Sequence, residues 1–431
     1  MVTQLANGLG DPNSIFWTTT ELKRYINESL RTWNSMAMYY KAQSSFNTVN
    51  GTAFYDLTTE LSTELGFTLQ DRDIITDIQY SLLEPPTPTS WTGTEMFTLQ
   101  QLTDAIQNRR NQFLLETGLI VTRTTQAITG SVLSPASRIS LTSDLIMTIR
   151  RLAWLVSSTY TQLWRQDEIE LNTYSVGLLT TAASTPQSYS VALTPNLTVQ
   201  IAPPANANGT LEILSINAPA ALDPSTGVLM NIPDDYCWAI KFGALADLLG
   251  GDGQRSDPLR SDYCEKRYRE GVELARIAVS IEQARIANIP VHPISIKDLD
   301  AYLPGWQNTT DDPTMLGVEA YNLIVLSPVP DTAFSITVDV VRKAPVPVNN
   351  SDNIDLGREE LDAVIDYAHH LAAFKMGGAE FQQTMPHYER LMRLASVQNS
   401  ILRANSFNFD VLTDRAQREE YFRPRRSEAA D

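Results

Sequence analysis

Cysteine, histidine and long apolar runs are all scarce in this chain of 431 residues. The two cysteines, Cys237 and Cys264, are too few for a disulfide framework, so we expect both to be buried free thiols. No run approaches the roughly 18 apolar residues of a membrane-spanning helix. The first residues, which read Met-Val-Thr-Gln-Leu-Ala-Asn-Gly, lack the basic and apolar segments of a signal peptide. The sequence therefore predicts a soluble protein made in a cytoplasm, with no membrane partner.

Basic residues are also in deficit. The chain has 33 Lys and Arg against 50 Asp and Glu, and its formal net charge is −17. A protein that grips nucleic acid does so with Lys and Arg that neutralise phosphates, so this balance argues against one. It does not exclude DNA that slides past a negative surface without being held. With 43% apolar and 19% charged residues, the chain has a globular composition and enough length for two or three domains.

The few histidines do not form a metal-binding pattern. His369 and His370 are adjacent on a predicted helix, so they point about 100° apart and cannot chelate one ion together. His292 and His387 lie elsewhere in the chain. The run that begins Gly250-Gly-Asp-Gly does not place its acids as a calcium loop needs, and we interpret it as a connector between two helices. We therefore expect no metal and no cofactor.

Two pairs of acids are the remaining candidates for catalysis. Asp234 with Asp235, and Glu359 with Glu360, could in principle act as general acid and base. Each pair precedes an apolar segment with helical spacing, where acids favour the positive end of the helix dipole. The capping interpretation is the simpler one. No nucleophile elbow, phosphate loop or dinucleotide fingerprint is present, so the sequence predicts a protein that is not an enzyme.

The C-terminal half repeats one pattern after about 125 residues. Two predicted strands at 197–219 precede two predicted helices at 234–278, and strands at 323–345 precede a similar helix pair. Each first helix begins with paired acids and stops at Gly-Gly. We interpret residues 166–403 as a duplicated strand–strand–helix–helix region, with units at about 166–285 and 293–396.

The N-terminal half also repeats itself. Thr18 and Glu21 form a predicted capping box, and Thr98 and Gln101 form a second one about 80 residues later. A hairpin with an Asn50-Gly51 turn is expected after the first helix. Residues 145–155 are expected to correspond to the helix near 71–83. We therefore interpret residues 1–165 as duplicated helix–hairpin–helix units at about 16–90 and 97–160. The helix faces expected to be buried are Leu22, Tyr25, Ile26, Leu30, Trp33 and Ala37, then Leu102 and Ile106.

Together these patterns predict an α+β fold that is mainly helical, with small antiparallel hairpins or sheets, built from two internal duplications. Residues 404–431 differ in character and form a predicted C-terminal arm. Aromatics alternate at its start and bases cluster near its end, so we expect the arm to bind a partner. The candidate contact residues are Phe407, Phe409, Tyr421, Phe422, Arg423, Arg425 and Arg426.

The opening Phe-Trp-Thr-Thr-Thr-Glu-Leu-Lys-Arg-Tyr-Ile-Asn, followed by Phe-Asn-Thr-Val-Asn-Gly-Thr-Ala-Phe-Tyr-Asp-Leu, resembles neck proteins of tailed bacteriophages, of the head-to-tail connector (adaptor) kind. The later helices, such as Asp366-Tyr-Ala-His-His-Leu-Ala-Ala-Phe-Lys-Met-Gly-Gly, look like packing helices of similar virion proteins. The chain departs from simple adaptors because it is longer and carries the pattern twice.

The resemblance implies a structural virion protein, assembled in the host cytoplasm. It implies a homomeric ring, commonly of twelve subunits, that joins the portal to other neck or tail proteins. Genomic double-stranded DNA passes through such a ring without specific binding. A tail-tube or collar protein and a virion-associated hydrolase are the alternatives, and a non-viral binding module built from repeats is a third. The subunit number, the host, the tail type and the surface that lines the channel are not set by the sequence.

Overall fold

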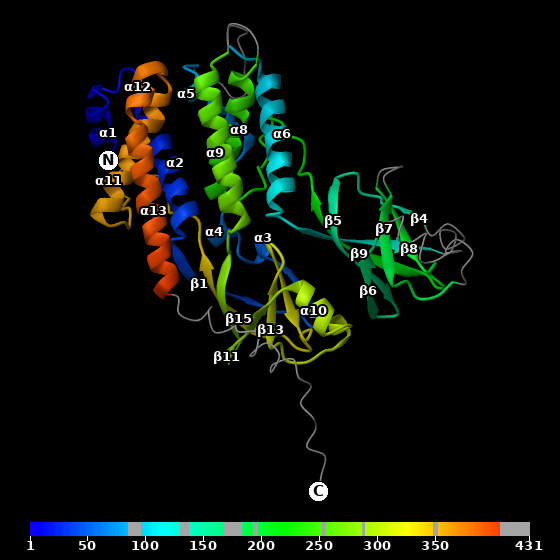
Figure 1. Cartoon of the computed structure of the whole chain (residues 1–431). Coiled ribbons are helices and arrows are strands. Elements are labelled where there is room, and N and C mark those ends of the chain that lie inside the picture. The colour runs from blue at the N-terminus through cyan, green and yellow to red at the C-terminus, as the bar shows by residue number, and fades with distance from the viewer. Residues whose placement is uncertain are drawn as a thin grey trace.

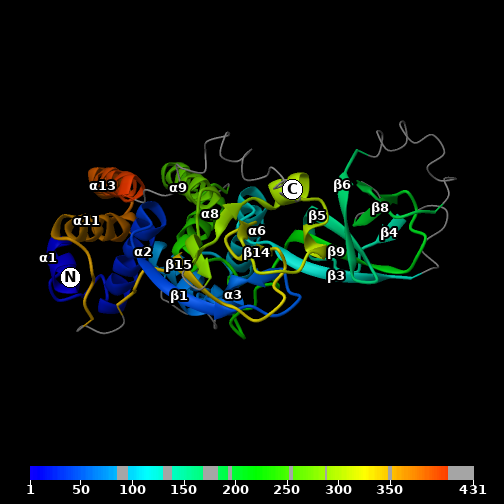
Figure 2. The ribbon, with the colours of Figure 1, turned by 90° about the horizontal axis from the view of Figure 1, so that it is seen from below.

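A computed structural model describes the chain except for residues 85–95, 130–137, 168–182, 193–196, 252–255, 287–288, 348–351 and 406–431 (Figure 1). An array of helices stands on two small sheets, and a larger sheet projects to one side (Figure 1). The view from below shows that the larger sheet extends the molecule along one direction (Figure 2).

The larger sheet has seven strands in the order β3-β9-β5-β6-β7-β8-β4. They are β3 (Thr122–Ile128), β4 (Arg138–Ser140), β5 (Ile146–Val156), β6 (Thr159–Arg165), β7 (Ser188–Ala192), β8 (Thr198–Ala202) and β9 (Gly209–Asn217). The sheet curls so far that its edges meet: the Gln126 side chain on β3 bonds to Ser140 O at 2.9 Å and to Thr142 N at 3.0 Å. Its concave side holds a separate apolar core that includes Trp154, Leu211 and Ile213.

Two four-stranded sheets lie below the helices. One has the order β1-β15-β10-β11, and the other has the order β12-β13-β14-β2. Their strands are β1 (Lys41–Asn47), β2 (Phe54–Asp56), β10 (Ile281–Ile286), β11 (Ile289–Pro290), β12 (His292–Ile294), β13 (Met315–Val318), β14 (Leu323–Ser327) and β15 (Ser335–Val341). Each sheet therefore joins a strand from the first 60 residues to strands from the last third of the chain. Short helices α3 (Leu57–Glu60), α4 (Ser62–Leu65) and α10 (Ile296–Tyr302) border them.

The long helices pack side by side above these sheets (Figure 1). They are α2 (Thr19–Ala37), α5 (Asp71–Ser81), α6 (Leu99–Thr117), α8 (Cys237–Leu249), α9 (Pro258–Arg276), α11 (Arg358–Phe374) and α13 (Met385–Asn405), with the shorter α1 (Val2–Gly8) and α12 (Gly378–Gln383). The predicted capping box of Thr98 and Gln101 forms in full, because Thr98 accepts from Gln101 N and the Gln101 side chain accepts from Thr98 N. At the first box only half forms: Thr18 accepts from Glu21 N, while the Glu21 side chain bonds to Tyr25 and Lys375. All residues predicted for the buried faces of α2 and α6 are buried, which confirms that local prediction.

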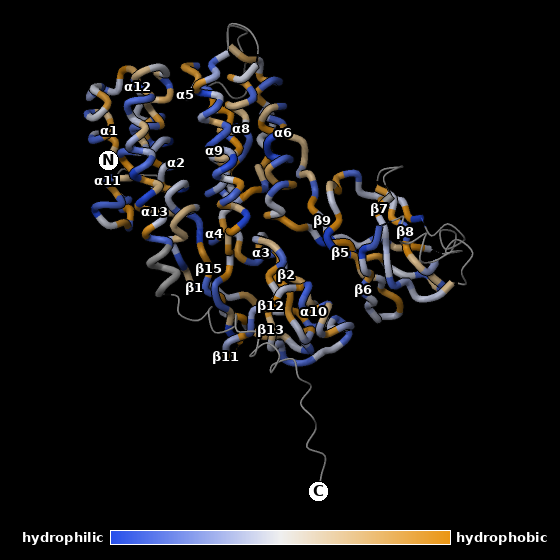
Figure 3. Tube along the Cα trace, in the orientation of Figure 1, coloured by the Kyte–Doolittle hydropathy of each residue, from blue (hydrophilic) through white to orange (hydrophobic). Residues whose placement is uncertain are grey.

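Helix α8 is buried on nearly all sides, while the helices around it carry alternating polar and apolar stretches (Figure 3). The close approach of α9 to α8 depends on Gly271. A Cβ atom at that position would lie 2.3 Å from the Cβ of Ala239, so a larger residue cannot fit without moving one helix. The short distance between α8 and α9 thus depends on one glycine as well as on apolar burial.

The predicted fold class is wrong. The fold is not mainly helical with small hairpins, because strands form three sheets in the described residues, one of them with seven strands. The Asn50-Gly51 turn exists, with Gly51 at φ +74°, but no hairpin forms around it. Its flanking strands β1 and β2 pair with β15 and β14. Residues 146–156, expected to match a helix, form strand β5.

The duplicated regions stay predictions, but the strands of each unit do not pair with one another. The order strand, strand, helix, helix does occur twice, as β8, β9, α8 and α9, and as β14, β15, α11 and α13. Yet β8 does not pair with β9, nor β14 with β15, because each finds its partners elsewhere in the chain. The larger sheet also crosses the predicted boundary at residue 165. The domain boundaries themselves stay predictions.

Candidate functional site

The acids Asp234 and Asp235 lie at the start of a short 3-10 turn, η2 (Asp234–Tyr236), that leads into α8. Asp234 accepts hydrogen bonds from Thr68 N at 2.8 Å, Thr68 Oγ1 at 2.6 Å and Leu69 N at 2.9 Å. Asp235 accepts from Asn34 Nδ2 at 2.6 Å and from Ala344 N at 3.1 Å. The two carboxylates therefore fasten other segments of the chain to η2.

This geometry differs from both sequence interpretations. The acids do not cap their own helix with a side-chain hydrogen bond, and both are buried with their oxygens already occupied by protein donors. Burial raises the pKa of Asp235 to about 7, against the opposing effect of its bonds to Asn34 and Ala344. The second pair, Glu359 and Glu360, lies in the first turn of α11, where acids favour the helix dipole. The two pairs of acids therefore differ in burial and in hydrogen-bond partners, although both precede a helix.

The cysteines and histidines serve packing. Cys237 and Cys264 are free and buried, as predicted, and burial raises the pKa of both thiols. His370 is fully buried between the Tyr263 hydroxyl at 2.8 Å and Thr384 Oγ1 at 2.9 Å, and burial lowers its pKa to about 3. It is therefore neutral at physiological pH. Across the described residues, no group of three or more His, Cys, Asp or Glu side chains could hold a metal ion.

The connector interpretation of the glycine-rich run is confirmed. Gly250 is the C-cap residue of α8, and Asp257 is the N-cap residue of α9. The Asp257 side chain accepts from Arg260 N at 3.1 Å, so this acid satisfies a helix terminus.

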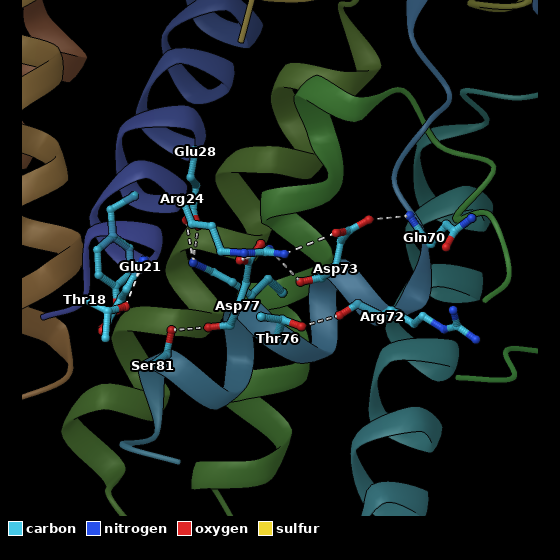
Figure 4. Close-up of polar contacts among 12 residues, drawn as sticks. Thr18, Glu21, Arg24, Glu28, Gln70, Arg72, Asp73, Thr76, Asp77 and Ser81 are labelled. Atoms are coloured by element: carbon cyan, nitrogen blue, oxygen red, sulfur yellow. Dashed lines mark hydrogen bonds and ion pairs between the residues drawn. The ribbon is translucent and has the colours of Figure 1, made fainter. Parts of the chain in front are cut away.

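The most developed polar arrangement runs along α2, and Figure 4 shows its contacts with α5. Arg24 contacts α5 through Asp77 at 2.6 Å and Asp73 at 3.2 Å. Glu28 pairs with Lys241 of α8 at 2.5 Å, and both side chains are less than a tenth exposed. One turn from the helix start, Glu21 pairs with Lys375, which follows α11, at 3.0 Å. Helix α2 thus ties the middle of the chain to its C-terminal helices.

A second polar cluster lies between α9, α11 and α13. Arg267 is fully buried, and its guanidinium donates to the hydroxyls of Tyr367 at 2.9 Å and Tyr388 at 3.2 Å. Its charge is balanced by Glu270 at 2.5 Å, and its Cζ lies 4.4 Å from the ring centre of Trp238. A buried guanidinium needs such partners because desolvation is costly.

The third cluster attaches the larger sheet to the rest of the molecule. Arg151 on β5 donates to both oxygens of Asp300, at 2.8 and 3.0 Å, and to Gln307 at 2.8 Å. Glu212 on β9 completes the group at 3.3 Å from Arg151, and Trp306 donates its indole N–H to Asp300 at 2.9 Å. This bidentate joint ties β5 of the larger sheet to α10 and to the turn that holds Trp306 and Gln307.

The predicted partner-binding residues Phe407, Phe409, Tyr421, Phe422, Arg423, Arg425 and Arg426 all lie outside the described residues. The structure describes the chain up to Asn405, the last residue of α13. The assignment of these seven residues to a partner contact therefore stays a prediction.

Six of the exposed apolar side chains belong to residues at one end of the helical array, the end away from the small sheets. They lie at or beside the termini of α2, α5, α6, α9 and α11, which point to the same side (Figure 1). We call these residues the apolar end: Ile15, Phe16, Leu83, Met96, Leu259 and Met376, each at least 40% exposed. Apolar side chains grouped on a surface are typical of a protein contact.

Sequence reasoning missed the buried ion pairs. A signal existed for one of them, because Lys241 interrupts the otherwise apolar run Cys-Trp-Ala-Ile-Lys-Phe-Gly, and a buried lysine must have an acidic partner. Arg151 and Arg267 gave no comparable signal, because neither interrupts a continuous apolar run in the sequence, although Glu270, the charge partner of Arg267, is only three residues away.

Comparison with known proteins gives a match to one protein family. The sequence model of the SU10 adaptor protein family matches residues 72–278, which is just under half of the chain. The match covers α5, α6, the seven-stranded sheet, α8 and α9. Among curated proteins, none matches this chain. Within the described residues, no helix is long and apolar enough to cross a membrane. The family match indicates a structural virion protein of the phage adaptor type rather than an enzyme.

Proposed function

We propose that this chain is the subunit of a homomeric ring in the neck of a tailed bacteriophage. The ring joins the portal to the tail proteins and lets genomic double-stranded DNA pass through its centre. The observation that carries the proposal is the SU10 adaptor match across residues 72–278, because it covers one continuous part of the fold, from α5 to α9.

The polar interior supports a structural role. The buried carboxylates of Asp234, Asp235 and Glu28 are each bonded to protein donors, which fixes them and leaves them unsuited to proton transfer with a substrate. Such networks hold helices and sheets at fixed angles, and a subunit that must fit between two other rings needs a fixed shape. The apolar end gives the subunit a surface that assembly can cover.

The net charge supports a DNA channel. Acids exceed bases by 17 in this chain, and a negative wall repels phosphate, so DNA can move along it without being held. The predicted arm at residues 404–431 supplies aromatic and arginine side chains for a contact with the portal or with the next neck protein.

The test is the mass of the purified protein, alone and mixed with the portal protein of the same phage, by native mass spectrometry. A ring-sized species, or one that forms only on the portal, supports the proposal. A monomer that ignores the portal refutes it. A ring that forms without binding the portal points instead to a tail-tube or collar protein.

The contribution of the arm is tested separately with a chain that ends at Asn405, which keeps α13 whole. The expected result is an unchanged helical spectrum with loss of portal binding. A full-length variant with Arg423, Arg425 and Arg426 all changed to Gln keeps the arm and removes its clustered charge, so it separates the effect of charge from the effect of the rest of the arm. Portal binding that survives the truncation contradicts the assignment of the arm.

A further inference from the structure

Strand β1 is a long sheet edge with no partner on one side. Its seven residues, Lys41–Asn47, pair in unbroken register with β15, from Lys41 opposite Val341 to Asn47 opposite Ser335. In the described part of the chain β15 is its only partner strand. Natural edge strands are usually short, bulged or rich in charge and proline, because an open edge recruits other strands. Strand β1 has one charge, no proline and no bulge.

The direction of each backbone group on β1 follows from two hydrogen bonds. Thr48 N donates to Phe334 O at 2.8 Å, and Arg342 N donates to Tyr40 O at 3.0 Å. Since backbone groups alternate along a strand, the even-numbered residues of β1 bond to β15. The N–H and C=O groups of Lys41, Gln43, Ser45 and Asn47 therefore point to the open edge, and these four residues are exposed.

The other sheet edges in the described residues are protected. In the larger sheet, the side chain of Gln126 bridges edge strand β3 to the opposite edge. The remaining edge strands β2, β4, β11 and β12 have only two or three residues each. Strand β1 is thus the long edge that stays open.

The sequence directly after α13 contains a segment with a strand-like pattern. Residues 406–412 read Ser-Phe-Asn-Phe-Asp-Val-Leu, in which Phe407, Phe409 and Val411 alternate with polar residues. This period of two is typical of a strand with one buried face. The segment has seven residues, the same length as β1.

Helix α13, which the segment follows in the sequence, packs beside α2, which β1 follows in the sequence. Asn399 donates its side-chain N–H to Met36 O at 2.9 Å, so α13 runs beside the C-terminal end of α2. From Asn399 the helix continues to Asn405, about 9 Å further. From Ala37 the chain reaches Lys41 through a link that spans at most about 14 Å. Both helices run toward the small sheets (Figure 1), so the described chain ends, at Asn405, on the side of the molecule where β1 lies.

We propose that residues 406–412 of the same chain add to the open edge of β1 as a parallel fifth strand of its sheet. The backbone groups of Gln43, Ser45 and Asn47 supply the hydrogen bonds. Phe407, Phe409 and Val411 lie on the face that holds Ala42 and Phe46, which β1 turns to the core. Asn408 and Asp410 lie on the opposite face with the exposed side chains of Gln43 and Ser45.

This inference does not depend on the ring, and it refines the role of the arm. If Phe407 and Phe409 are fixed on their own subunit, the part of the arm that reaches a partner begins after residue 412. Tyr421, Phe422 and the three arginines then remain for that contact. The root of the arm gains a fixed position and direction, which lowers the entropy lost on binding.

The test is amide hydrogen exchange on the isolated full-length chain and on a chain that ends at Asn405. The amides of Gln43, Ser45 and Asn47 should exchange more than about tenfold faster in the shorter chain. The amides of Ala42, Ser44 and Phe46 bond to β15, so they should stay protected in both chains and act as an internal control for folding.

Two double variants test the two faces of the segment, residues 406–412, one at a time. Phe407→Ser with Phe409→Ser should reproduce the fast exchange of the truncated chain. Asn408→Ser with Asp410→Ser, in the same segment, should leave the slow exchange unchanged. Odd-numbered amides that exchange equally fast in full-length and truncated chains overturn the proposal. Protection that appears only as protein concentration rises also overturns it, because a second copy then supplies the strand.

Discussion

Replacing Asp235 with Asn should make the protein less sensitive to alkaline pH. Asp235 is buried where η2, α2 and the segment after β15 meet, and its Oδ2 receives both Asn34 Nδ2 and Ala344 N. Asn can place its own oxygen at that position, so Asp235→Asn copies the protonated acid. Burial raises the pKa of Asp235 from 3.8 to about 7, with Asp234 adding to the rise and Arg31 opposing it.

The direction in which stability changes with pH follows from proton binding. The folded state holds a proton on Asp235 at pH values where the unfolded chain has released it, so stability falls as the pH rises. The contribution is fully present below about pH 4 and is lost as the pH passes about 7. A difference of about 3 pKa units corresponds to about 4 kcal/mol, of which about 2.5 kcal/mol falls between pH 5 and pH 8.

The assay is urea unfolding of both proteins at pH 5 and pH 8. Other titrating groups, including Glu28 and His370, contribute equally to both proteins and cancel in the comparison. Relative to the wild type, Asp235→Asn should gain about 2.5 kcal/mol in free energy of unfolding between the two pH values. If the difference between the two proteins is the same at both pH values, the carboxyl is not protonated in the folded state and the reasoning fails.

Three further substitutions test the packing. Gly271→Val should destabilise the α8–α9 pair by about 1–3 kcal/mol or more through overpacking, whereas Gly251→Ala, at an exposed glycine with room for a Cβ, should change the urea midpoint little. Arg151→Met leaves Asp300 buried without its cation and should cost about 3–5 kcal/mol; an unchanged thermal midpoint would show that the joint carries no stability. Trp17→Phe removes the hydrogen bond to the α11 backbone and should cost about 0.5–1.5 kcal/mol by urea unfolding, and a larger loss would mean that ring packing dominates there.

Local features were predictable from the sequence because their causes lie within a few residues. Thr18 and Thr98 cap helices as their patterns indicate, and the apolar spacing from Leu22 to Trp33 marks the buried face of α2 correctly. The predicted strand ranges at 197–219 and 323–345 were also located correctly, since they contain β8, β9, β14 and β15.

Strand pairing was not predictable because it is decided between distant segments. The Asn50-Gly51 signal fixes a turn but does not specify a hairpin, and the turn instead bonds to Pro330 O through Gly51 N. Residues 146–156 contain many β-branched and aromatic side chains, yet an apolar run of that length is also compatible with a buried helix. The acids at 234 and 235 were found by pattern, while their role depends on Thr68, Asn34 and Ala344.

The pairing of β1 with β15 has a consequence for the order of events in the host cell. Lys41 leaves the ribosome early, but its partner Val341 follows only after another three hundred residues have been made. The same holds for β2 and β14. Sheets that join distant segments form slowly, and until then their edges are open to other chains. A nascent or prematurely ended chain therefore presents incomplete sheets, and only subunits synthesised beyond α11 can close the core to which α2 belongs.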